Sequence, residues 1–288
     1  MIAIRTPKQT HIRFGKIFIR KYTHERKLIR TEQLSSKSSQ QDIADALRPH
    51  FDRQSPVLLK SPNTDCDAVR CWKSLDYLRT KVGEDAPCMV EIGGSYSNPN
   101  MERPEITFGD YIQYMTMFQE RYGEEGNGRE EDEPNSEELV YLAQNDLLSP
   151  LYKDFELPQL CRDPSFNVGN GRLYSTMLWF GPRGCVSPLH FDPLDNLLMQ
   201  FVGRKQVILF SNNDDANAWH YAGHDRQQFN TSPVDVTNPD LDEFPLFANA
   251  PVAIECQIEP GDIVYIPSKF WHHVTSFDTS ISVNTWWR

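Results

Sequence analysis

The second half of the chain alternates apolar and polar positions over short runs that are separated by turn residues. This pattern predicts eight strands, at residues 173–180, 186–191, 196–202, 206–210, 252–258, 263–266, 273–276 and 280–287. Gly203-Arg204 and Pro260-Gly261-Asp262 are typical turn sequences between such strands. Many short strands at this spacing indicate a mainly β fold, a double-sheet jelly roll, rather than a parallel α/β sheet.

Helical spacing of apolar residues dominates earlier in the chain. Three such runs begin near residues 41, 72 and 107, with short strands predicted at residues 56–59 and 88–92 between them. The third run starts at Thr107, whose side chain can cap the helix while Asp110 completes a capping box. We therefore expect one domain over residues 41–288, with a helical and short-strand part at 41–170 and the jelly-roll core at 171–288.

The first 40 residues are basic and then rich in Ser and Gln, which is typical of a solvated, disordered tail or a targeting segment. No apolar run approaches the ~18 residues that a membrane span needs. We expect an intracellular protein, nuclear or cytoplasmic, with a mitochondrial location as the alternative that the basic N-terminus raises. The six cysteines are scattered without a C-x-x-C pair, so we expect reduced thiols.

Charge is distributed unevenly along the chain. The net charge is −11, yet residues 1–31 hold nine Lys and Arg against Glu25 alone, which leaves the remainder at −19. A body this acidic disfavours unspecific binding of nucleic acid and favours a basic protein segment as partner. The acidic run at residues 120–138 contains too few apolar residues to order itself, so we expect a mobile surface loop there.

The candidate chemistry lies at His190-Phe191-Asp192, where a histidine and a carboxylate two residues apart project from one face of a predicted strand. A third metal ligand is available in His272, whereas the adjacent His273 should point the other way. Two histidines and one carboxylate leave coordination positions open, which suits Fe(II) and dioxygen chemistry. The H-x-D motif alone is weak, and hydrogen-bonded structural histidines or a zinc hydrolase with the same ligands remain alternatives.

Lys205 lies in the turn region after the third predicted strand of the jelly roll. Its ammonium group is a candidate cation for the carboxylate of a dicarboxylate ligand. The competing interpretation is a turn lysine that faces solvent.

Residues 179–205, 230–241 and 260–287 together resemble the JmjC oxygenases, and within them the lysine-specific demethylase 8 subgroup of protein arginyl hydroxylases. The resemblance covers residues 41–288 and implies a cupin-like double-stranded β-helix that binds Fe(II), 2-oxoglutarate as cosubstrate and dioxygen. By position, His190, Asp192 and His272 match the iron ligands. The remaining matches are the residues that contact the cosubstrate, Lys205, Tyr96, Ser187 and Asn196, and an aromatic residue of the substrate cleft, Trp179.

The resemblance implies a hydroxylase that couples decarboxylation of 2-oxoglutarate to succinate with hydroxylation of an arginine in a protein or peptide. Demethylation of N-methyl-lysine, which starts with the same hydroxylation, remains an alternative, as does hydroxylation of a tRNA base. A cupin-like binding module without turnover is the alternative outside enzymes. The sequence leaves the oligomeric state and the identity of the substrate open.

Overall fold

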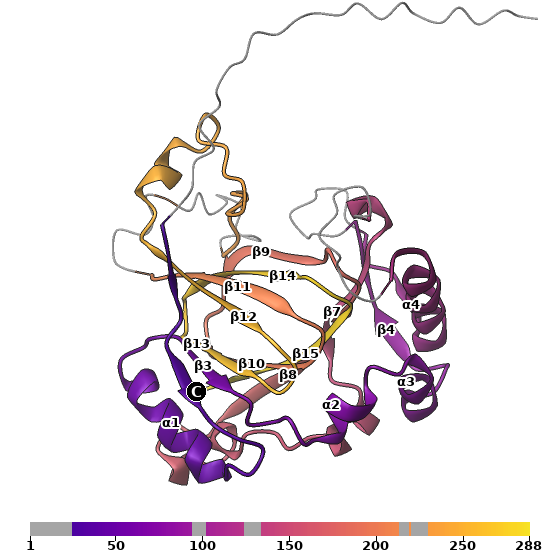
Figure 1. Cartoon of the computed structure of the whole chain (residues 1–288), viewed down its shortest axis with the longest axis horizontal. Coiled ribbons are helices and arrows are strands. Elements are labelled where there is room, and N and C mark those ends of the chain that lie inside the picture. The colour runs from indigo at the N-terminus through magenta and orange to yellow at the C-terminus, as the bar shows by residue number, and fades with distance from the viewer. Residues whose placement is uncertain (1–24, 94–101, 124–133, 213–218, 220–229) are drawn as a thin grey trace, which may run out of the picture.

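The computed structural model describes residues 25–93, 102–123, 134–212, 219 and 230–288. Two β-sheets face each other and form a barrel (Figure 1). The smaller sheet has the order β1 (Arg26–Leu28), β12 (Ala253–Ile258), β11 (Lys205–Phe210), β14 (Trp271–Ser276), β9 (Val186–Phe191). The larger has the order β2 (Thr31–Gln33), β3 (Val57–Lys60), β13 (Ile263–Ile266), β10 (Asp195–Val202), β15 (Ser280–Trp287), β8 (Leu173–Gly181), β7 (Val140–Asp146), β5 (Glu91–Ile92).

Within the described residues, every strand pair is antiparallel except β1 with β12 and β2 with β3. A separate hairpin-like pair joins β4 (Pro87–Met89) to β6 (Glu105–Thr107). Apolar side chains of both large sheets, including Leu198, Val207 and Val274, meet inside the barrel. The prediction of a mainly β jelly roll is confirmed.

All eight strands predicted after residue 171 form, and most of their ends agree within one residue. The largest difference is at β14, which begins at Trp271 and not at residue 273, because Trp271 pairs with Phe210 on one side and Phe191 on the other. His272 therefore lies on a strand. The pattern did not predict β7, which pairs with β8 and extends the larger sheet into the part of the chain before residue 171.

In the described part of the chain, four α-helices lie outside the barrel, next to the larger sheet (Figure 1): α1 (Gln40–Asp52), α2 (Asp67–Cys71), α3 (Leu75–Val82) and α4 (Phe108–Tyr122). Thr107 caps α4 as expected, since its hydroxyl oxygen accepts a bond of 3.1 Å from the Asp110 N–H. The core on this side joins helix and sheet, and the rings of Trp72 and Phe201 lie 5.0 Å apart between centroids. None of the helices in the described residues is long and apolar enough to cross a membrane.

The expected tail at residues 1–40 contains ordered structure in its last third. β1 pairs with β12, β2 pairs with β3, and the buried side chain of Ile29 joins the apolar barrel interior. The described part of the domain therefore begins before residue 41. Strands of three residues that contain no fully buried side chain are too short for an alternation pattern to reveal. Most of the predicted acidic loop, residues 124–133, lies outside the described residues, and all six cysteines have free thiols.

Candidate metal centre

Pairing of β9 with β14 places the predicted metal ligands together. His190 lies directly opposite His272 in the strand register, and their imidazole centroids are 4.1 Å apart. Asp192 lies one residue beyond the end of β9, with its Oδ2 3.7 Å from Nε2 of His272. One ligand atom from each residue lies within 4.8 Å of the others, which is the spacing needed to hold a metal ion.

The backbone sets the same tautomer in both histidines. Nδ1 of His190 lies 2.7 Å from the carbonyl oxygen of Pro188, and Nδ1 of His272 lies 2.9 Å from that of Phe270. A carbonyl oxygen only accepts, so each Nδ1 carries the proton and each Nε2 keeps its lone pair for a metal. Burial and the neighbouring His190 lower the pKa of His272 to about 4, so this imidazole is neutral near neutral pH.

Hydrogen bonds from two further side chains reach the Asp192 carboxylate. The indole N–H of Trp286 donates to Oδ2 at 2.9 Å, and the Asn196 amide donates to the same oxygen at 3.5 Å. Sequence analysis did not assign Trp286 to the site, because the terminal Trp pair is equally typical of core packing. The structure separates the two: Trp287 is fully buried in the core, and Trp286 lines the metal pocket.

Lys205 lies inside the barrel, with only 1% of its surface exposed, so the interpretation as a solvent-facing turn lysine is wrong. Its ammonium donates to the hydroxyl of Tyr141 at 3.2 Å. Burial lowers its pKa to about 7, because within the described residues no carboxylate compensates for the lost hydration. An anionic ligand that bound beside Lys205 would supply the negative charge that this buried amine lacks.

Tyr141 is a pocket residue that sequence analysis missed. It lines the same pocket as Lys205, whereas the predicted Tyr96 lies outside the described residues. The apolar run at residues 140–143, which begins β7, is the signal that could have identified Tyr141 as a buried strand residue.

The other predicted residues line this pocket as well. Trp179, Ser187 and Asn196 are buried beside the metal ligands, and the Trp179 indole donates to Asn284 at 2.9 Å. The Asn196 amide oxygen is buried without a partner in the described part of the chain, so it can accept a hydrogen bond from a ligand. The cavity among these side chains is small, about 30 Å³.

These donors fit a divalent transition metal. Two imidazole nitrogens and one carboxylate oxygen converge from one side, which leaves the opposite positions for a ligand. Lys205 lies in the same pocket as the metal ligands, so a ligand that chelates the metal at one end can pair a carboxylate at its other end with the Lys205 ammonium. His273 points out of the barrel as predicted and lines a different cavity.

Comparison with known proteins identifies the family of this chain. A family model described as a cupin-like domain matches residues 44–288. Lysine-specific demethylase 8 of Danio rerio is 37% identical over 219 residues, which are 74% of this chain and 48% of the relative. Lysine-specific demethylase JMJ30 of Arabidopsis thaliana is 32% identical over 244 residues, 84% of this chain and 52% of the relative.

A third relative, Jumonji C domain-containing protein 5 of Drosophila melanogaster, is 30% identical over 241 residues, 82% of this chain and 55% of the relative. The chain thus spans about half the length of these curated relatives. The family match covers every described strand from β3 onward, most of α1, the other three helices and all three metal ligands. The chain belongs to the cupin-like JmjC domain family.

Proposed function

We propose that the chain is an Fe(II)- and 2-oxoglutarate-dependent hydroxylase that acts on an arginine side chain of a protein substrate. The observation that carries this proposal is the presence of the His190, Asp192 and His272 cluster and the buried Lys205 cation in one pocket. A metal site with open positions and a cation for a distal carboxylate are the two requirements of this chemistry.

The role of each residue follows from its geometry. His190 and His272 present Nε2 lone pairs, and Asp192 presents an oxygen while Trp286 holds its carboxylate. Bound iron supplies activation of dioxygen, coupled to decarboxylation of 2-oxoglutarate to succinate and carbon dioxide.

Lys205 and Tyr141 orient the cosubstrate in this proposal. The Lys205 ammonium pairs with its distal carboxylate, and the Tyr141 hydroxyl, 3.2 Å from that ammonium, donates a second hydrogen bond. Because the arriving carboxylate stabilises the charged amine, it raises the pKa of Lys205 from about 7. Burial of both groups excludes water from this end of the pocket.

A cationic substrate suits the remaining walls. Trp179 and Trp286 present aromatic surface beside the metal ligands, and aromatic faces attract guanidinium groups. The charge of −19 after residue 31 attracts a basic protein segment over longer distances. Hydroxylation of an arginine carbon requires the cleft to hold the aliphatic part of the arginine side chain beside the metal.

N-methyl-lysine demethylation is the second candidate, because two of the similar proteins carry the name lysine-specific demethylase. A relative named tRNA wybutosine-synthesizing protein 5 from Homo sapiens is 33% identical over 140 residues, 48% of this chain. The acidic body disfavours a tRNA substrate. A binding module without turnover is disfavoured by the intact set of three ligands.

The test is incubation of the purified chain with Fe(II), 2-oxoglutarate and peptides that contain arginine or N-methyl-lysine, followed by succinate measurement and mass spectrometry. Gain of one oxygen atom on arginine supports the proposal, whereas loss of a methyl group from lysine supports demethylation. His190→Ala should abolish succinate formation. Turnover that continues without oxygen would instead identify a hydrolase.

A further inference from the structure

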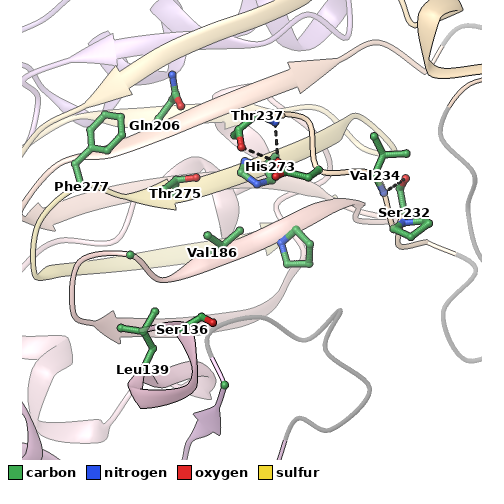
Figure 2. A pocket seen from close by; sticks show the side chains of 15 residues that line it. Ser136, Leu139, Val186, Gln206, Ser232, Val234, Thr237, His273, Thr275 and Phe277 are labelled. Atoms are coloured by element: carbon green, nitrogen blue, oxygen red, sulfur yellow. Dashed lines mark hydrogen bonds between the residues drawn. The ribbon is translucent and has the colours of Figure 1, made fainter. Parts of the chain in front are cut away.

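Figure 2 shows the residues that line a second cavity, of about 570 Å³. This cavity lies on the opposite face of β14 from the metal centre. Side chains alternate between the two faces of a strand, so sequence neighbours of metal-pocket residues line it: Gln206 follows Lys205, and His273 follows His272. None of the described residues lines both cavities. The two sites therefore share strands but no side chains.

Two residues that line this cavity each carry a polar atom that has less than 1 Å² of exposed surface and no hydrogen-bond partner among the described residues. These atoms are Nδ1 of His273, a residue only 4% exposed, and Oγ1 of Thr275. The two residues lie two positions apart on β14, so both project from the same face, and Figure 2 shows them among the residues that line the cavity. Unsatisfied buried polar atoms are costly, which favours a ligand or water that bonds to them.

Among the described residues that line the cavity, Asp235 is the only charged one, and its side chain is exposed to solvent. Its Oδ1 accepts hydrogen bonds from the N–H and the hydroxyl of Thr237, at 2.8 Å and 2.6 Å. Within the described chain, Oδ2 accepts none, so one oxygen of a fixed carboxylate is available to a ligand. The cavity thus combines a negative charge with neutral groups that can accept hydrogen bonds.

We propose that this cavity binds the guanidinium group of an arginine side chain on a protein partner. A guanidinium has N–H donors in several directions and no acceptor, which matches the exposed Asp235 carboxylate. The Thr275 hydroxyl oxygen and the His273 ring nitrogen add two acceptors once these side chains rotate toward the cavity. Val186 and Phe277 supply apolar surface for the aliphatic stem. This site is independent of the proposed oxygenase function, since it shares no residue with the metal pocket.

The experiment is a calorimetric titration of the full chain with N-acetylarginine amide, with N-acetylcitrulline amide as the uncharged probe of nearly the same shape. The arginine probe should bind more tightly than the citrulline probe. Thr275→Val keeps the side-chain shape and should weaken binding about fivefold through loss of one hydrogen bond. Asp235→Asn should weaken it about threefold, because the charge pair is exposed to solvent.

Asp240→Asn is the matched control. Its Oδ1 caps a nearby turn in the same way, through the N–H groups of Asp242 and Glu243, but Asp240 does not line the cavity. This variant should bind the arginine probe like the original chain. Thermal melting of all three variants shows whether each is folded.

The proposal is wrong if the arginine probe does not bind, if citrulline binds equally well, or if Asp235→Asn and Thr275→Val both bind like the original chain. It is also wrong if His190→Ala abolishes binding, since the probe would then occupy the metal centre. Arginine binding that persists in a chain without succinate formation would support this site and overturn only the oxygenase proposal.

Discussion

Trp286 donates its indole N–H to the Asp192 carboxylate across 2.9 Å, and this bond connects the two sheets of the barrel at the metal centre. Trp286 lies on β15 of the larger sheet, whereas Asp192 follows β9 of the smaller sheet. Hydrogen bonds to a ligating carboxylate fix its orientation before the metal arrives. Trp286 is therefore a positioning residue for the metal ligand.

Trp286→Phe should weaken metal binding by about tenfold, because the carboxylate loses its indole donor while the aromatic ring remains. Titration with Co(II), followed by visible absorption, measures this affinity without turnover. Trp179→Phe is the matched control, since that indole lies in the same pocket but donates to Asn284. Equal affinities in the two variants would contradict the positioning role.

Lys205 should make stability depend on pH. Its pKa is about 7 in the folded chain and near 10.5 when unfolded, so between these values the unfolded state binds more protons and stability rises with pH. Below about pH 7 both states are protonated, and the full cost of the buried charge applies. Lys205→Met should raise the free energy of unfolding by a few kcal/mol near pH 6, and by less as pH rises toward about 10.

Urea unfolding of the original chain and Lys205→Met across this pH range measures the difference. If the difference in unfolding free energy between the two chains did not change with pH, the pKa of Lys205 would not be lowered in the folded chain, and the prediction would be wrong.

Tyr141 should contribute to cosubstrate binding. Tyr141→Phe removes the hydroxyl that contacts Lys205 and should weaken 2-oxoglutarate binding about fivefold, the effect of one lost hydrogen bond. Calorimetry with Mn(II) under anaerobic conditions measures binding without turnover. Tyr96→Phe tests the sequence prediction that Tyr96 also contacts the cosubstrate, and binding that is unchanged in Tyr141→Phe would contradict the role of Tyr141.

Gly203 should be intolerant of any side chain. Its φ is +68°, and a Cβ atom would lie 2.2 Å from the carbonyl oxygen of Thr279, in the turn that leads into β11 and Lys205. Gly203→Ala should cost about 3 kcal/mol or more of stability, from backbone strain and this clash together. Chemical denaturation measures the loss.

Gly123→Ala separates the two causes. Gly123 also has a positive φ, of +78°, but no atom lies within 4 Å of the added Cβ. This variant should cost only about 1 kcal/mol, the strain contribution alone. Similar losses in the two variants would mean that Thr279 moves aside easily.

Patterns local to the chain were enough to predict the strands of the jelly roll, the cap at Thr107 and the His190-Phe191-Asp192 motif. Each depends on residues a few positions apart, because alternation, helix capping and the two-residue repeat of a strand are short-range properties. The candidate ligand His272 also came from sequence, through its position after a predicted turn and the family resemblance.

Only the tertiary structure decided which of these residues meet and which are buried. Pairing of β9 with β14 brings His190 opposite His272, and enclosure by both sheets turns Lys205 from a turn lysine into a buried cation beside Tyr141. Trp286 reaches Asp192 for the same reason. Strand pairing and burial depend on contacts between distant segments, which no window of neighbouring residues contains.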